Sequence, residues 1–200
     1  ALDGLAEGKD TLDTAKLDAV SGYFSTAANS STVKADGIDT IDKLKAALEA
    51  GGTVELTDDI AYDTRVDITI TQPVTLDLKG HTVEETYGGI NHFLMTIKGG
   101  SLTLTDSVGG GALIASHASY GYGIRLYSNS TFIMNGGTIR TSQETVDLYD
   151  SVSNVKVEIN GGSLISTADS TMGIRGSQNV DVDIKGGTME SSGRVGFYIS

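Results

Sequence analysis

Hydrophobic and polar residues alternate along the second half of the chain in short segments that recur every 25 residues. Segments 129–139, 154–164 and 179–189 share one order: an Asn, an alternating apolar run, a Gly pair and a second short apolar run. A two-residue period is typical of a β-strand that buries one face. One unit is too small to bury its apolar face alone, whereas stacked units bury it together. The pattern therefore predicts a solenoid of parallel strands with one coil per unit.

Equivalent positions in successive units predict the contents of the core. With each coil about 4.8 Å above the preceding one, the inward residues form continuous columns. The expected columns are Phe132/Val157/Val182, Met134/Ile159/Ile184 and Ile139/Leu164/Met189. Asn129, Asn154 and Asn179 share one coil corner, and we expect their amides to hydrogen-bond in a ladder, as stacked asparagines do in cross-β structures.

The third strand of each coil carries charged and aromatic residues. Gly-Ile-Arg occurs at 123–125 and again at 173–175, so a constant period places Arg125, Asp150 and Arg175 in one column. Opposite charges on neighbouring strands contribute roughly 0.2–1 kcal/mol per pair, which favours a solvated ladder of ion pairs. Aromatic rings beside guanidinium groups also suit sugar rings. The alternative is a ligand-binding surface formed by Arg125, Tyr127, Tyr149, Asp150, Arg175 and Tyr198.

Acidic residues occupy outward positions of the first strand in two successive coils. The register places Glu158 against Asp183, with Asp181 on the same strand. A like-charge pair costs energy unless something lies between, and Ca²⁺ takes about six to eight oxygen ligands, so these three residues are candidate calcium ligands. Lys156 and Lys185 flank them, which favours a solvated charged face instead. No other cofactor is expected.

The first fifty residues follow a different pattern. Only four of the 26 glycines lie there. Ile41, Leu44 and Leu48 stand at helical spacing before a Gly-Gly pair, which predicts an amphipathic helix that covers the apolar end of the first coil. The expected organisation is an N-terminal extension, partly helical or loop, at 1–39, a capping helix at 40–50 and a parallel β-helix at 51–200.

The last coil has no polar capping segment after it in this sequence. Residues 195–200 are in register with the third strand of the preceding coil and stop there. Because an open strand edge is a template for further pairing, we expect the solenoid to continue beyond residue 200, or another molecule to cover this edge. Self-association through the open C-terminal coil is one such arrangement.

Composition narrows the classes of function. The 200 residues are 38% hydrophobic and 20% charged, enough to bury a core. The net charge of −12 disfavours nucleic acid and anionic lipid as partners. No apolar run approaches the roughly 18 residues of a membrane span, so membrane insertion is not expected. His81, His92 and His117 lack catalytic or metal-ligand spacing, and each is expected at a surface or turn.

Two sets of sequence strings carry a family resemblance. They are Val-Thr-Leu-Asp-Leu-Lys-Gly-His-Thr-Val at 74–83 and the later Asn/Lys-Gly-Gly-Ser/Thr repeats. Over about residues 40–200 the chain resembles right-handed parallel β-helix domains of the pectin-lyase-like superfamily, as found in secreted and surface proteins of bacteria. The resemblance implies an all-β, right-handed, single-stranded parallel β-helix. In lyases of this fold it further implies a carboxylate calcium site and a catalytic arginine, for which Arg175 is the candidate.

The function expected from the sequence is structural or adhesive. The fold hosts lyases, hydrolases, adhesins and phage tailspikes, so it implies no single activity. We expect a segment of a bacterial extracellular or cell-surface protein whose outer face weakly recognises a polysaccharide or a host-surface glycan. Catalysis is disfavoured because the Asn-Thr-Asp, Gly-His-Gly and Arg-Ile-Lys strings of polygalacturonases are missing and the later coils are too short to wall a cleft. The alternatives are a polysaccharide lyase or glycoside hydrolase, and a phage tailspike or fibre segment.

Overall fold

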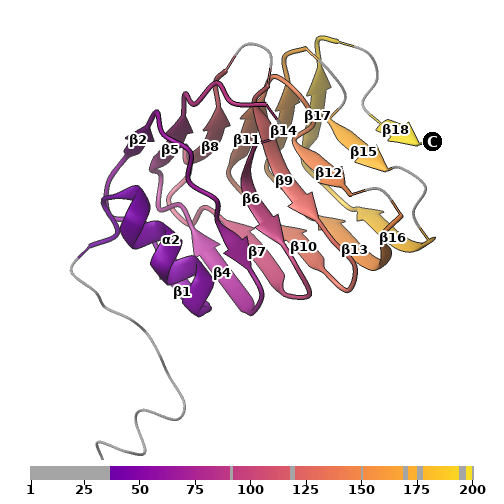
Figure 1. The fold of residues 1–200 in the computed structure, drawn as a ribbon, viewed down its shortest axis with the longest axis horizontal. Helices are drawn as coiled ribbons and strands as arrows, with labels where there is room; N and C mark the ends of the chain where they lie inside the picture. The colour runs from indigo at the N-terminus through magenta and orange to yellow at the C-terminus, as the bar shows by residue number, and fades with distance from the viewer. Residues whose placement is uncertain are drawn as a thin grey trace, which may run out of the picture. The chain divides into compact units, whose positions relative to one another are not determined.

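The compact unit at 33–200 is a parallel β-solenoid. The computed structural model describes residues 37–90, 92–117, 120–149, 151–168, 171–174, 178–193 and 197–199. The N-terminal extension predicted at 1–39 lies outside these residues except for its last three. The strands of the unit form three sheets of six strands each, and each coil contributes one strand to every sheet (Figure 1).

Neighbouring strands run parallel in all three sheets, which confirms the predicted all-β parallel solenoid. The first sheet comprises β1 (Gly52–Glu55), β4 (Pro73–Asp77), β7 (Ser101–Thr105), β10 (Thr131–Met134), β13 (Ser153–Ile159) and β16 (Gln178–Ile184). The second comprises β2 (Ile60–Tyr62), β5 (Thr82–Glu85), β8 (Ala112–Ala115), β11 (Thr138–Thr141), β14 (Ser163–Ser166) and β17 (Thr188–Ser191). The third comprises β3 (Thr69–Ile70), β6 (Phe93–Ile97), β9 (Tyr122–Leu126), β12 (Val146–Leu148), β15 (Met172–Ile174) and β18 (Phe197–Ile199).

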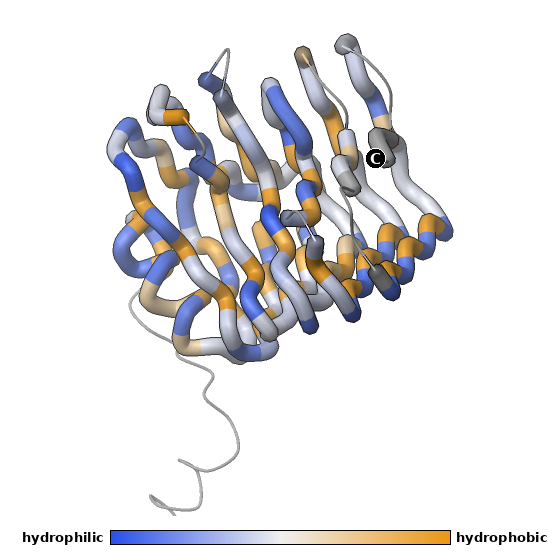
Figure 2. The backbone as a smooth tube through the Cα atoms, turned by 45° about the vertical axis from the view of Figure 1, so that its right-hand side comes forward, coloured by the Kyte–Doolittle hydropathy of each residue, from blue (hydrophilic) through white to orange (hydrophobic). Residues whose placement is uncertain are grey.

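The first and second sheets keep the 25-residue register in the later coils. Phe132 pairs with Val157, which pairs with Val182, so the predicted column is confirmed. The columns that begin at Met134 and Ile139 are confirmed in the same way. Hydrophobic and hydrophilic residues alternate along these strands, as Figure 2 shows for the coils nearest the C-terminal end. This alternation sends one set of side chains into the solenoid and the other into solvent.

The third sheet departs from the constant period. Arg125 pairs with Asp147, 22 positions later, and Asp147 pairs with Gly173, 26 positions later. The predicted column of Arg125, Asp150 and Arg175 is therefore wrong.

The cause of this shift is a difference in turn length. Residues 142–145 join β11 to β12, whereas residues 116–121 join β8 to β9 in the preceding coil. The interval from Leu148 to Lys156 is three residues longer than the interval between their partners, Leu126 and Thr131, and this restores the 25-residue total. Turns can exchange residues in this way because the buried columns, and not the sequence spacing, hold each strand in register.

A helix covers the first coil. It is α2 (Ile41–Ala50), and it is the only helix in the part of the chain that the structure describes. The Thr40 side chain accepts a hydrogen bond from a backbone N–H of the first turn, and Gly51, with φ +89°, ends the helix. Leu44 and Leu48 are fully buried, and the helix contacts β1, β2 and β3. The predicted helix and its apolar face are confirmed.

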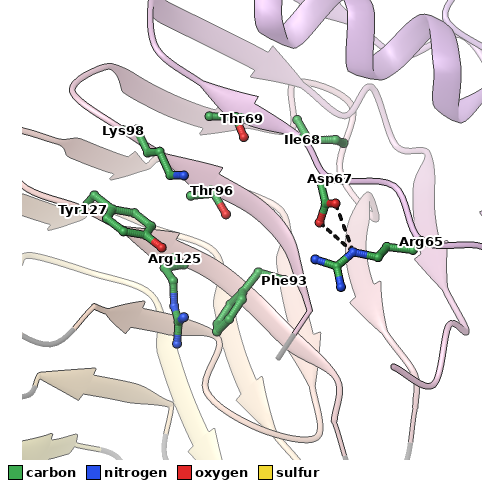
Figure 3. A pocket seen from close by; sticks show the side chains of 9 residues that line it. All are labelled: Arg65, Asp67, Ile68, Thr69, Phe93, Thr96, Lys98, Arg125 and Tyr127. Carbon is green, nitrogen blue, oxygen red and sulfur yellow. Dashed lines mark hydrogen bonds and ion pairs between the residues drawn. The ribbon is translucent and has the colours of Figure 1, made fainter. Parts of the chain in front are cut away.

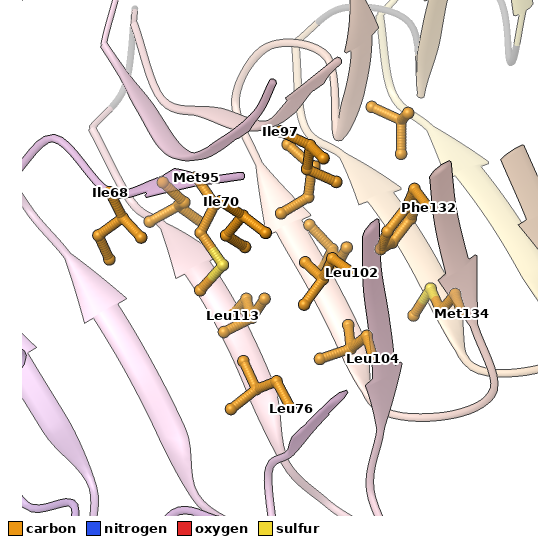
Figure 4. Packing of buried hydrophobic residues seen from close by; sticks show 14 of the residues in the cluster. Ile68, Ile70, Leu76, Met95, Ile97, Leu102, Leu104, Leu113, Phe132 and Met134 are labelled. Carbon is orange, nitrogen blue, oxygen red and sulfur yellow. The ribbon is translucent and has the colours of Figure 1, made fainter. Parts of the chain in front are cut away.

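The core is a continuous stack of aliphatic side chains along the solenoid axis. Figure 4 shows this packing in the middle coils, where Leu76, Leu104 and Met134 follow one another in a single column. All three are fully buried, as is Phe132, the largest fully buried side chain. Each layer therefore packs against the layers before and after it, which a single coil could not do alone.

The predicted asparagine ladder is present at the corner before the first sheet. Asn154 Nδ2 donates to Asn129 Oδ1 at 3.1 Å, and Asn179 Nδ2 donates to Asn154 Oδ1 at 2.5 Å. All three residues have φ between 53° and 60°, in the left-handed region that Asn tolerates better than most side chains. Asn thus meets two requirements at this corner: it tolerates the left-handed backbone of the turn, and its amide hydrogen-bonds to the neighbouring coil.

Candidate functional site

An open groove lies on the outer face of the third sheet. Its volume is about 260 Å³. Its walls come from β3, β6 and β9 and from the segment before β3. The lining residues are Arg65, Asp67, Ile68, Thr69, Phe93, Thr96, Lys98, Arg125 and Tyr127 (Figure 3).

Arg125 is fixed in this groove by a carboxylate and an aromatic ring. Its Nε and Nη2 atoms each lie 2.7 Å from Oδ2 of Asp147, whose side chain is buried. Its guanidinium carbon lies 3.8 Å from the centre of the Phe93 ring. Charge-assisted hydrogen bonds and cation–π contacts both hold a guanidinium in one orientation. A guanidinium has more N–H donors than the Asp147 contacts use, so Arg125 can also donate to a ligand.

Two stacked tyrosines extend the groove along the sheet. The rings of Tyr127 and Tyr149 lie 4.7 Å apart with an interplanar angle of 18°, and Lys98 Nζ lies 4.7 Å from the centre of the Tyr127 ring. These residues directly follow β6, β9 and β12, so the parallel register of the strands brings them into one column. Together they form a column in which the Tyr127 ring lies between the Lys98 ammonium group and the Tyr149 ring.

The structure brings together three of the six predicted ligand-binding residues. Arg125, Tyr127 and Tyr149 lie within one cluster, and the Arg125 guanidinium is 5.2 Å from the Tyr149 ring centre. Asp150 and Arg175 lie outside the described residues. The backbone at position 198 pairs with Gly173 in the third sheet, but its side chain is also outside the description. Ligand binding by these residues stays a prediction.

Sequence reasoning missed Phe93, Lys98, Arg65 and Asp67 as members of this surface. Phe93 begins β6 and Lys98 follows it, in an early coil that does not follow the 25-residue repeat. Aligning Ile97-Lys98 with Leu126-Tyr127 would have found the lysine. The Arg65–Asp67 pair lies in the connection before β3, where no repeat gives a signal.

The predicted calcium ligands lie on the first sheet and have lysine partners. Glu158 pairs with Asp183 across β13 and β16, as expected. Glu158 lies 2.8 Å from Lys156 Nζ and 3.1 Å from Lys185 Nζ, and Lys185 also lies 3.1 Å from Asp183. Hydrogen bonds from Lys156, Asn160 and Lys185 lower the pKa of Glu158 to about 2.

These contacts leave little for a metal ion to gain. Within the described ranges, no group of three or more His, Cys, Asp or Glu side chains is placed to hold one. A calcium ion at Glu158, Asp181 and Asp183 would have to displace the ammonium groups of Lys156 and Lys185 from Glu158 and Asp183. Calcium binding stays a prediction.

One histidine differs from its expected location. His92 was predicted at a surface or turn; it lies in the connection before β6, but its side chain is only 2% exposed, so it is not a surface residue. It lies beside Glu85, at the end of β5, and Asp67, at the wall of the groove. His92 is buried by contacts with segments that are distant in the sequence, and the local hydrophobic pattern does not predict such contacts.

The remaining observations concern membranes and relatives. In the described part of the chain, no helix is long and apolar enough to cross a membrane.

The sequence matches no protein-family model, and comparisons with curated proteins and with solved structures find no significant match.

Proposed function

We propose that this chain is a structural or adhesive β-helix segment of a bacterial extracellular or cell-surface protein, of the pectin-lyase-like type, and that the groove on its third sheet binds a glycan. The observation that carries the proposal is the clustering of Phe93, Arg125, Tyr127 and Tyr149 on one face of a rigid sheet.

The chemistry of this cluster suits a sugar. The C–H groups of a pyranose can contact the exposed edges of the stacked Tyr127 and Tyr149 rings, while its hydroxyl groups accept hydrogen bonds from Arg125 and Lys98. Arg125 is already oriented by Asp147, so little conformational entropy is lost when a ligand binds. An open groove of this size accommodates one or two sugar units of a longer chain and leaves the rest in solvent.

The solenoid supports a structural role independently of the groove. Every coil packs on its neighbours through buried columns, so stiffness and length grow together as coils are added. A stiff segment with a shallow binding surface suits multivalent attachment, in which many weak contacts act together.

The test is binding measured on a glycan array, followed by titration calorimetry with each glycan selected. Tyr127→Ala is expected to weaken binding about tenfold, because it removes one of the two stacked rings. Tyr120→Ala is the matched control: Tyr120 is 41% exposed, close to the 43% of Tyr149, and does not line the groove. Equal affinity of the two variants, or binding to no glycan, would contradict the proposal.

The same sample distinguishes binding from catalysis. Polygalacturonate and alginate, incubated with the protein with or without calcium, are expected to release neither unsaturated products nor reducing ends. Turnover would instead support the lyase or hydrolase alternative.

A further inference from the structure

A buried histidine lies between two carboxylates behind the groove. His92 and Glu85 have side chains that are 2% and 4% exposed, and His92 Nδ1 lies 2.6 Å from Glu85 Oε1. On the other side of the ring, His92 Nε2 lies 3.5 Å from Asp67 Oδ1. Glu85 is fully enclosed, whereas Asp67 is exposed and lines the groove.

The polar atoms of this cluster are poorly satisfied. Glu85 Oε1 and both ring nitrogens of His92 are buried, and no described residue makes a well-aligned hydrogen bond to them. Nδ1 and Oε1 are close enough for a hydrogen bond, but their alignment is not that of one. Buried polar atoms without partners cost free energy and are uncommon in native proteins. A small movement of the ring or of Asp67 would improve these contacts.

The two tyrosines that surround the cluster stay neutral near pH 7, so His92 is the group whose charge the proposal concerns. The Tyr87 ring meets His92 edge to face at 5.4 Å. Burial, together with the negative charge of Glu85, raises the pKa of the Tyr62 hydroxyl, so Tyr62 stays neutral. Histidine is the side chain type that ordinarily changes charge between pH 5 and 8.

Asp67 links the buried histidine to the groove. Arg65 Nε lies 3.1 Å and 3.0 Å from the two carboxylate oxygens of Asp67. A hydrogen bond from Arg65, with a smaller contribution from its positive charge, lowers the pKa of Asp67. Lys45 also contacts the backbone carbonyl of Asp67. Asp67 is thus shared between an exposed guanidinium in the groove and a buried imidazole behind it.

We propose that Glu85, His92 and Asp67 form a relay that sets the position of Arg65 in the groove according to pH. In the neutral imidazole, Nδ1 keeps its hydrogen toward Glu85, so the lone pair of Nε2 faces the Asp67 carboxylate. When a proton from solvent binds Nε2, the new N–H donates to Asp67 Oδ1. Asp67 then turns toward His92, and its contact with Arg65 weakens.

The consequence for the groove follows from charge. At acidic pH, Arg65 is released from Asp67 and can donate to a ligand beside Phe93 and Arg125. The inference rests on the proposed function for this consequence only, because the movement of Arg65 does not require a ligand. A glycan bound by the groove is expected to bind more tightly at pH 5.5 than at pH 7.5.

The test follows Arg65 and His92 by nuclear magnetic resonance in the ligand-free protein. The Arg65 Nε–H signal is expected to shift between pH 5 and 8 with the same midpoint as the His92 ring nitrogens. In Asp67→Asn the carboxylate is lost while the exposed side chain keeps its shape, so the pH response of Arg65 is expected to disappear and the titration of His92 to persist. Because the Asp67 side chain is exposed, this substitution is not expected to disturb the fold.

His81→Gln is the matched control. His81 also faces an aspartate, with Nδ1 3.4 Å from Asp59 Oδ1, but it does not line the groove. This variant is expected to leave the Arg65 response unchanged. If the Arg65 signal does not change with pH, or if the His92 ring does not titrate between pH 5 and 8, the inference is overturned and glycan binding is left intact. Failure of every glycan to bind would overturn the proposed function and leave the Arg65 result intact.

Discussion

The two ends of one buried column differ sharply in exposure. Val54 begins the column under α2 and is 4% exposed, whereas Ile184 ends it in β16 and is 43% exposed. The residues between them, from Leu76 to Ile159, are essentially buried. Register and residue type are similar along the column, so they do not explain the difference. The cover supplied by the helix does, because a repeating coil buries its apolar face only against something placed on it.

The coils near the two ends also rely on different interactions. The early coils vary in length and carry the groove, the Arg125–Asp147 pair and the buried His92. The later coils keep a constant length in the first two sheets and are joined on their surface by asparagine ladders and lysine–carboxylate pairs. The candidate chemistry of the described residues therefore concentrates where the repeat is least regular. A regular repeat optimises stacking, and departures from it create concave surfaces.

The largest expected effect is the loss of a helix anchor at the covered end. Leu48→Ala removes a fully buried side chain between α2 and the first coil, and we expect it to lower the free energy of unfolding by about 2–5 kcal/mol. Ile184→Ala is the comparison at the other end, where the side chain is already partly in solvent, and we expect a loss below about 1 kcal/mol. Urea unfolding followed by circular dichroism measures both.

These two variants test the explanation given for the column. Similar losses at Leu48 and Ile184 would mean that the C-terminal edge is covered in solution by another molecule, such as a second copy of the chain. Light scattering over a range of concentrations would then detect the association.

A smaller effect is expected in the asparagine ladder. Asn154→Ala removes the amide bonded to both Asn129 and Asn179, and it places alanine at φ 57°. The lost hydrogen bonds and the left-handed backbone together predict a loss of about 2 kcal/mol. Asn154→Gly also removes the amide but tolerates the backbone angle, so its loss is expected to be about 1 kcal/mol smaller. If alanine and glycine destabilise the protein equally in urea unfolding, backbone strain does not contribute at this corner.

The parts of the fold predictable from sequence are those encoded by a local period. The spacing of Ile41, Leu44 and Leu48 reports a helix face, and the alternation around Phe132 and Val157 reports a strand face. In both cases the same short-range pattern decides the secondary structure and the buried side. The asparagine ladder was predictable for the same reason, because its members recur with the period of the coil.

The parts that were not predictable depend on turn lengths or on distant contacts. The third sheet shifts its register because turns before and after β12 exchange residues while the total stays constant, which a repeat count cannot detect. As a result, Asp147 was overlooked as the partner of Arg125. Phe93 and Lys98 lie in a coil that does not follow the 25-residue repeat, and the burial of His92 requires the packing of Glu85 and Asp67 from separate segments. The described half of the predicted ligand-binding set gathers in one cluster, but the local sequence did not report its surroundings.

The smallest expected effect concerns pH at the lysine-flanked end. Hydrogen bonds from Lys156, Asn160 and Lys185 lower the pKa of Glu158 from 4.5 to about 2 in the folded protein. Because the folded pKa lies below the unfolded one, the stabilisation is fully present above about pH 4.5 and is lost as pH falls through about 2. Glu158→Gln is therefore expected to be slightly less stable than the parent at pH 6, with the difference vanishing near pH 2. Urea unfolding across this pH range measures it.

A mutant cycle that combines Glu158→Gln with substitution of both lysines assigns the effect to the lysines. If the ammonium groups hold the carboxylate ionised, Glu158→Gln made in a Lys156→Gln, Lys185→Gln background should show a smaller pH-dependent difference than in the parent. Raising the salt concentration should also reduce the difference in the parent, because these side chains lie at the surface and added ions screen them. The Leu48→Ala loss at the helix-covered end arises from apolar burial, so it has no such dependence on pH or ionic screening. A Glu158→Gln difference that persists at pH 2, or that is unchanged in the lysine-free background, would show that the charged contacts between β13 and β16 do not stabilise the later coils.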